Sequence, residues 1–123
     1  MSLPVHPVLV VLLVALGGSV GAVLRHLAST SPLGPVRGVL LVNLVGAASL
    51  GVLVGLGPVL PGWLFLLLGT GVCGAVTTWS TLAVQTWELG RESWRRAAAY
   101  LGVSVTLGVA LAALGYALAT ALR

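Results

Sequence analysis

The segment that decides the fold spans residues 71–82 and reads GVCGAVTTWSTL. It lies inside a long apolar stretch, which predicts a membrane helix from about Trp63 to Leu89. Glycines precede the run TTWST at 77–81, whose hydroxyl side chains favour alternatives to helical hydrogen bonding. We therefore expect a break in this helix, with a continuous, threonine-rich packing helix as the alternative. Broken backbone at membrane depth must be buried in protein or line a wet cavity, and its freed carbonyls are ready ligands for a small cation.

The rest of the chain has the composition of a membrane protein. Of its 123 residues, 59% are hydrophobic and 7% are charged, which leaves no polar shell for a soluble domain. At about 20 apolar residues a span, there is room for roughly four helices. We predict an all-α membrane protein with a single domain over residues 1–123. Its helices are expected at about Val5–Ser29, Val36–Leu56, Trp63–Leu89 and Ser93–Leu122, the first being a retained helix and not a signal peptide because no basic region precedes it.

Small residues recur at helical spacing among the 17 glycines. The pairs are Gly17 with Gly21, Gly51 with Gly55, and Gly71 with Ala75. Small residues four apart allow helix backbones to approach closely, so ordinary helix packing explains most of these glycines. Because four short helices make a thin bundle, we also expect an oligomer.

Charged residues exclude several classes of function. The six basic residues are all arginines and are dispersed, which argues against nucleic acid as a partner. Cys73, the only cysteine, excludes an intrachain disulfide and a cysteine-ligated metal. No catalytic triad, carboxylate pair or metal cluster points to an enzyme. Glu88 and Glu92, the only carboxylates, lie in the connection expected around Glu88 to Arg96, so a proton-coupled exporter of cations would lack its acid within the membrane.

Donor groups remain at membrane depth, and these suit an anion. Asn43 lies near the middle of the second helix and either forms hydrogen bonds to another helix or is a donor in a pore. Arg25 either snorkels to the interface or attracts anions at the mouth of a vestibule. His26 is interpreted as interfacial, and Trp87 and Trp94 as anchors at the level of the lipid headgroups.

At these residues the sequence resembles the Fluc/CrcB fluoride channel family. That family's third helix has a pattern close to GFCGGFTTFSTF, against GVCGAVTTWSTL at 71–82 here. The resemblance continues in GSVGAVLR at 18–25 and in GVLLVN at 38–43 followed by Gly46. It implies an antiparallel, dual-topology dimer in a bacterial plasma membrane, with paired fluoride pores and a central structural sodium ion. The sodium would be held by backbone carbonyls that correspond to Gly74 and Thr77.

The resemblance also assigns residues to the fluoride path. Arg25 corresponds to the vestibule arginine, and the pore residues correspond to Asn43, Trp79, Ser80, Thr81, Leu82, Tyr100 and Ser104. On the fourth helix, Gly108 and Ala112 stand where related channels often keep hydroxyls, so the track is shorter here. Trp79 and Leu82 replace two phenylalanines whose ring edges meet the anion. Tryptophan keeps an aromatic edge and adds an N–H donor, whereas leucine offers neither.

Arginines are distributed unevenly between the two ends of the predicted bundle. The end with both termini has only Arg123, whereas the other has Arg37, Arg91, Arg95 and Arg96, plus Arg25 if it snorkels. Because arginine asymmetry sets orientation, one orientation is favoured. The chain is therefore predicted to pair either with an inverted copy of itself or with an oppositely oriented homologue.

The predicted function is passive export of fluoride to protect the cytoplasm, with membrane lipid as the surroundings. Hydrogen fluoride enters a cell as a neutral acid and ionises, so the trapped anion needs a pore to leave. Two alternatives stay open: a conduction-impaired structural half of a heterodimeric channel, and a coupled transporter of small ions.

Overall fold

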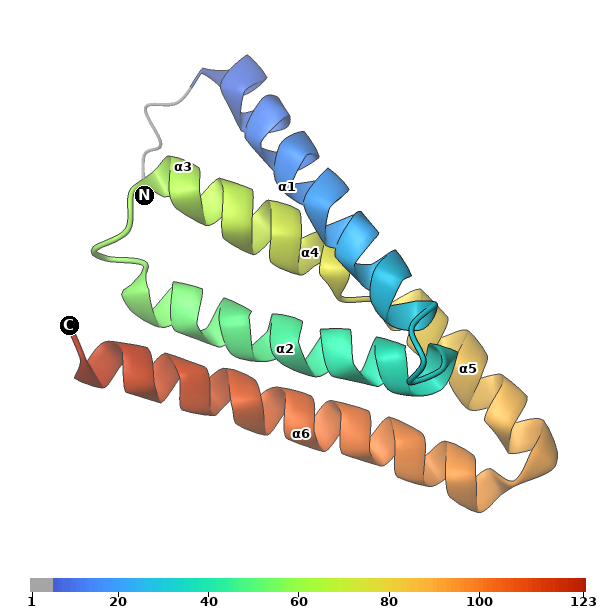
Figure 1. Cartoon of the computed structure of the whole chain (residues 1–123). Helices are drawn as coiled ribbons and strands as arrows, with labels where there is room; N and C mark the ends of the chain where they lie inside the picture. Colours follow the sequence, from blue (N-terminus) through green and yellow to red (C-terminus); the bar gives the residue numbers. More distant parts are fainter. Residues whose placement is uncertain (1–5) are drawn as a thin grey trace.

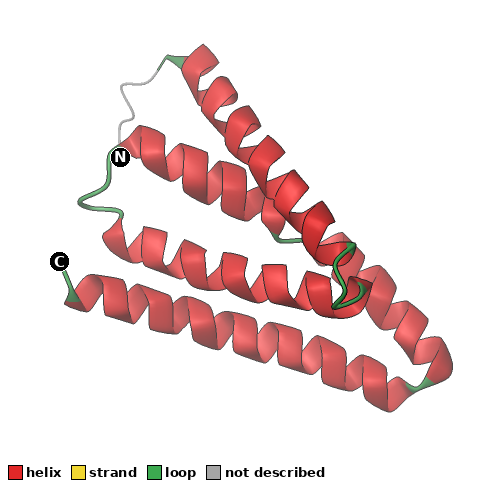
Figure 2. Cartoon of the chain, viewed as in Figure 1, coloured by secondary structure: helices red, strands yellow, loops and turns green. Residues whose placement is uncertain are grey.

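The computed structural model describes residues 6–123, which are helical apart from short connections (Figure 2). Four helices are long and apolar enough to cross a membrane: Pro7–Ser29, Pro35–Leu56, Gly62–Glu92 and Trp94–Ala121. The prediction of an all-α chain with four spans is thus confirmed, although the expected start at Val5 lies outside the described residues. The elements are α1 (Pro7–Ser29), α2 (Pro35–Leu56), α3 (Gly62–Phe65), η1 (Leu66–Cys73), α4 (Gly74–Val76), α5 (Trp79–Glu92) and α6 (Trp94–Ala121).

Proline and glycine set the helix boundaries much as expected. Pro7 and Pro35 begin α1 and α2, where a missing N–H costs nothing. Gly34, just before α2, has a φ of 85°, the only positive φ among the described residues. This conformation is one that glycine adopts without strain, which explains the sharp turn between α1 and α2.

The third span differs from the uniform helix predicted for its first half. Residues Leu66–Cys73 form a π-helix, and the N–H of Gly74 donates to the carbonyl of Gly69, five residues earlier. No residue type in this segment predicts a π-helix. Such segments are rare and occur often at functional sites, and only α4 (Gly74–Val76) separates this one from the run predicted to break, which begins at Thr77.

Glycine allows close backbone contact at the two main helix interfaces. In Figure 1, α2 lies along α6, while α1 crosses the third span and packs against η1 and α4. A Cβ atom on Gly17 would lie 2.1 Å from the carbonyl oxygen of Leu67, and one on Gly51 would lie 2.1 Å from that of Ala112. Both distances are far below van der Waals contact, so the predicted packing role of these glycines is confirmed.

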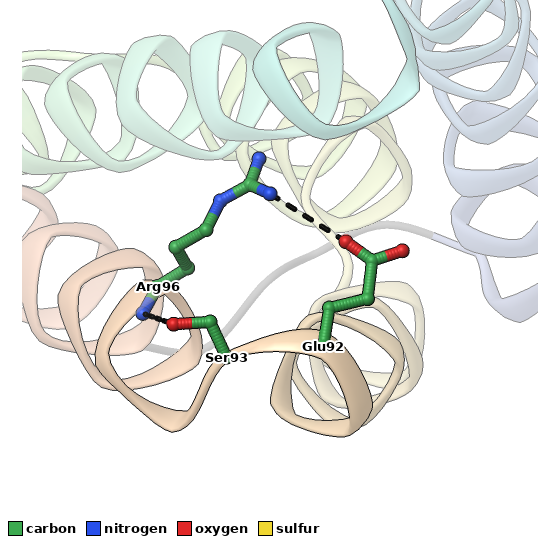
Figure 3. A network of polar contacts seen from close by, with 3 residues as sticks. All are labelled: Glu92, Ser93 and Arg96. Atoms are coloured by element: carbon green, nitrogen blue, oxygen red, sulfur yellow. Dashed lines mark hydrogen bonds and ion pairs between the residues drawn. The ribbon is translucent and has the colours of Figure 1, made fainter.

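The third connection is shorter than the sequence suggested. The helix expected to end at Leu89 continues as α5 to Glu92, and only Ser93 separates it from α6. Ser93 caps α6 by accepting from the N–H of Arg96 at 3.4 Å, and the Arg96 guanidinium lies 3.5 Å from the Glu92 carboxylate (Figure 3). The connection between α5 and α6 can be this short because a serine cap and an i,i+4 ion pair let two helices meet across one residue.

The two ends of the bundle carry different charges, as predicted. The start of α1, the α2–α3 connection and the C-terminus lie at one end, and the α1–α2 and α5–α6 connections lie at the other (Figure 1). Around the α5–α6 connection, Arg91 stacks on Trp87 at 5.1 Å and Arg95 on Trp94 at 5.7 Å, each measured to the ring centroid. Both tryptophans are well exposed, in keeping with the expected interfacial role.

Candidate functional site

The third span breaks at Thr77 and Thr78. Thr77 has φ −81° and ψ 149°, and Thr78 has φ −149° and ψ 121°, so both are extended between α4 and α5. The predicted break is confirmed, and the alternative of a continuous packing helix is wrong. This short extended segment would expose backbone polar groups at membrane depth unless other groups satisfied them.

Asn43 of α2 satisfies the backbone of Thr78. Its side-chain oxygen accepts from the Thr78 N–H at 2.7 Å, and its side-chain nitrogen donates to the Thr78 carbonyl at 3.2 Å. One carboxamide thus pairs with both polar groups of one extended residue. The interpretation of Asn43 as a link between helices is correct in this respect, and the link is to backbone instead of to another side chain.

The hydroxyl of Thr78 caps the N-terminus of the next helix, α5. It accepts from the N–H of Thr81 at 3.2 Å, which makes Thr78 the N-cap of α5. It also lies 3.1 Å from the Thr81 hydroxyl and 3.3 Å from that of Ser80. Thr78 is buried, so its hydroxyl and both of its backbone groups find partners within the protein.

The bonds that the N–H groups of Thr78 and Thr81 make change the hydrogen bonding of the Gly74 and Thr77 carbonyls. In a continuous α-helix, the N–H of Thr78 would donate to the carbonyl of Gly74, and the N–H of Thr81 to that of Thr77. Here the first N–H donates to Asn43 and the second to the Thr78 hydroxyl. Gly74 is also exposed, and a Cβ built on it would meet only the carbonyl oxygen of Gly69, at 3.9 Å. The two carbonyls that the resemblance assigns to a cation are therefore among those that lose their helical donors at the break.

A groove of about 350 Å³ lies beside the break. It brings together four of the predicted pore residues from three elements: Asn43 of α2, Trp79 and Leu82 of α5, and Ser104 of α6. We call it the polar groove because its lining also includes both threonines of the break, and none of its lining residues is charged. The remaining lining residues are Ala47, Val105, Gly108 and Val109.

Ser104 is the unusual group in the polar groove. The residue is 7% exposed, and its Oγ is the one buried side-chain oxygen or nitrogen among residues 6–123 without a hydrogen-bond partner. An unpaired buried hydroxyl costs free energy, so its persistence needs an explanation. Leu82 is similarly buried, at 4% exposed, whereas Trp79 is 69% exposed at the groove edge.

The other predicted site residues lie outside the polar groove. Arg25 and Thr81 line a separate pocket of about 210 Å³ with His26 and Ser29. Ser80 is exposed at the start of α5. The Tyr100 hydroxyl donates to the Gln85 side-chain oxygen at 2.6 Å inside the α5–α6 interface, so it is occupied within the protein. Sequence reasoning missed the roles of Gln85 and Thr78, although the run of hydroxyls gave a signal for Thr78.

A second, larger groove is almost wholly apolar. It measures about 450 Å³ and lies between α1, α2 and the π-helical part of the third span. Ser49 is its only hydroxyl-bearing residue. The other lining residues are Leu24, Val45, Gly46, Val52, Leu53, Leu68, Val72, Cys73 and Val76, and we call it the apolar groove.

The chain is similar to known proteins over most of its length. Residues 12–116 match the family model described as "CrcB-like protein, Camphor Resistance (CrcB)". The protein named fluoride-specific ion channel FluC 1 of Geobacillus kaustophilus is 41% identical, with 85% of this chain and 93% of its own length aligned. FluC 2 of Rhodococcus jostii is 44% identical over 88% and 96%, and FluC 2 of Mycobacterium tuberculosis H37Rv is 44% identical over 83% and 84%.

Proposed function

Because this chain belongs to the CrcB-like protein family, we propose that it is a passive, fluoride-selective channel that exports fluoride from the cell. Its four spans make it a multi-pass membrane protein, and as a member of a channel family it is not an enzyme. Passive export needs no energy coupling, since fluoride trapped in the cytoplasm moves down its own gradient. The named relatives are bacterial, which supports a place in the bacterial plasma membrane.

The observation that carries the proposal is the unpartnered Ser104 hydroxyl in an uncharged groove. A dehydrated anion needs donors to replace its water, and a hydroxyl with no internal partner can supply one. The Asn43 amide lines the same groove. The absence of carboxylates and arginines from this lining suits an anion that must bind weakly enough to leave again.

The remaining predicted pore residues differ in whether they line the polar groove. Trp79 and Leu82 line the polar groove in place of the family's phenylalanines, and Trp79 offers a ring edge and an indole N–H. Ser80 and Thr81 stay predicted parts of the path, whereas the Tyr100 hydroxyl is bonded to Gln85 and is not proposed to meet the anion. Arg25, in the pocket with Thr81, is proposed to attract anions at a vestibule.

We also propose that a structural sodium ion is bound by the carbonyls of Gly74 and Thr77. Oxygen ligands suit a hard cation, and these carbonyls are the ones whose helical donors are diverted. No group of three or more His, Cys, Asp or Glu side chains that could hold a metal lies within residues 6–123, and the ligands proposed here are backbone oxygens. Gly74 is exposed on the protomer surface, which supports a site that a second protomer completes.

The proposed assembly is an antiparallel dimer of this chain. Two observations support a partner: the polar groove is open at the surface, and Trp79 at its edge is largely exposed despite its size. A second protomer covering this face would close the groove into a path that excludes bulk water.

Fluoride flux from liposomes that contain only this protein tests the function. Vesicles loaded with potassium fluoride are diluted into potassium-poor buffer, and valinomycin sets the membrane potential. Voltage-driven fluoride efflux with no chloride efflux is the expected result. Efflux that requires a proton gradient would instead identify a coupled transporter, and silence in well-folded dimers would favour a structural role.

The arginine asymmetry favours a second candidate, the structural half of a heterodimeric channel. Arg37, Arg91, Arg95 and Arg96 lie at one end of the bundle and Arg123 at the other. Labelling of cysteines engineered at the termini, from each side of the membrane, measures orientation. Labelling from both sides supports the homodimer, whereas one-sided labelling with monomers in detergent would support an oppositely oriented homologue as the partner.

A further inference from the structure

We infer that Asn43 is a positioning residue that keeps the third span broken, and that through Thr78 it links the polar groove to the carbonyl of Gly74. The inference concerns the helix break itself. Its consequences for ions rest on the proposed function, so its test has a readout that does not depend on flux.

The first step is a competition for one N–H. The Thr78 N–H has two possible acceptors, the Gly74 carbonyl in a continuous helix or the Asn43 oxygen in the broken one. The observed bond to Asn43 is short, at 2.7 Å, and the same side chain also satisfies the Thr78 carbonyl at 3.2 Å. At membrane depth little water is available to bond the N–H and carbonyl of Thr78. The protein group that bonds them therefore determines the backbone conformation.

The second step is the fit between α2 and the break. Gly46 lies three residues after Asn43 and therefore on the same side of α2. A Cβ on Gly46 would clash with the Cγ2 methyl of Thr77, so the Thr77 side chain packs directly against α2. This contact places Thr78 within reach of a side chain as short as asparagine.

The third step concerns the unused part of the carboxamide. An asparagine side chain has two N–H donors, and one is committed to the Thr78 carbonyl. Asn43 also lines the polar groove, where its second N–H is free to face an anion. One side chain thereby holds the break and presents a donor, and losing it returns the Gly74 carbonyl to the helix.

The test uses side chains that keep different parts of the carboxamide. Asn43→Asp keeps an acceptor for the Thr78 N–H but loses the donor, Asn43→Leu has a similar shape and keeps neither, and Asn43→Ser is too short to reach. Carbon-13 chemical shifts of labelled threonines in bilayers report whether Thr77 and Thr78 are extended or helical. Ser49→Ala, on the same helix but in the apolar groove, is the matched control.

We expect the Thr77 and Thr78 shifts to change from extended to helical values in the leucine and serine variants. The aspartate variant and the control should keep extended values, while the aspartate variant loses fluoride flux for want of the donor. Extended shifts in both the leucine and serine variants would overturn the inference, as would helical shifts in the aspartate variant. If the native protein passes no fluoride while the threonine shifts of all variants are as expected, the proposed function is wrong and the inference about the break still holds.

Discussion

The two grooves along α2 differ more in the chemistry of their lining residues than in their volume. The apolar groove is the larger, at about 450 Å³ against about 350 Å³, and Ser49 is its only hydroxyl-bearing residue. The polar groove is lined by Asn43, by the two threonines of the break and by Ser104, whose buried hydroxyl has no partner. An ion path is therefore identified by donors that the protein leaves available, and the larger hollow is suited to lipid chains or close helix packing.

Filling the polar groove should have the largest effect on flux. Gly108 lines this groove, and nothing lies within 4 Å of where its Cβ would be, so Gly108→Leu adds a side chain without a backbone clash. We expect fluoride efflux to fall by at least about tenfold, because the added side chain occupies the narrow path. Efflux from liposomes with equal amounts of folded dimer measures the change.

Two leucine substitutions serve as controls for that comparison. Gly102 lies on the same helix with equally open surroundings but lines neither groove, and Ser49 lies in the apolar groove. Gly102→Leu and Ser49→Leu should both keep near-native efflux. If Ser49→Leu blocks efflux and Gly108→Leu does not, the assignment of the two grooves is reversed.

The sequence alone predicted those features that depend on composition and local residue type. The four spans follow from uninterrupted apolar residues, and close packing at Gly17 and Gly51 follows from small residues four apart. The break followed from hydroxyl residues after glycines, since threonine at 78 can cap a helix locally. The glycine pairs and the cap at Thr78 are each encoded within about one helical turn, where spacing is a sufficient guide.

Contacts between distant residues could not be predicted in the same way. Asn43 and Thr78 are separated by 35 positions, and Tyr100 and Gln85 by 15, so no local pattern pairs them. Tyr100 and Ser104 are four apart and both buried, yet the Tyr100 hydroxyl meets α5 while Ser104 lines the polar groove. Their spacing places both residues on one helix face, but which neighbour each one meets depends on how the helices cross.

Removing the free hydroxyl of the polar groove should have a smaller effect than filling the groove. Ser104→Ala takes away one donor, and a single hydrogen bond corresponds to about a threefold to tenfold loss of flux. Thermal stability in detergent should not fall, because the deleted hydroxyl has no partner within the protein. Ser104→Thr, which keeps the hydroxyl, is the rescue variant. Unchanged flux in Ser104→Ala would remove this residue from the path.

Tyr100 provides the opposite case on the same helix, with the smallest expected effect on flux. Its hydroxyl is committed to Gln85, so Tyr100→Phe should lower the free energy of unfolding by about 1 kcal/mol and leave fluoride efflux near the native rate. Gln85 is buried at 8% exposed and loses its partner in this variant, so adding Gln85→Leu should recover part of the stability. Denaturation of the two single variants and the double variant measures this coupling. Lost flux with unchanged stability in Tyr100→Phe would show that the hydroxyl leaves Gln85 to meet the anion, and would extend the conducting path beyond the polar groove along α6.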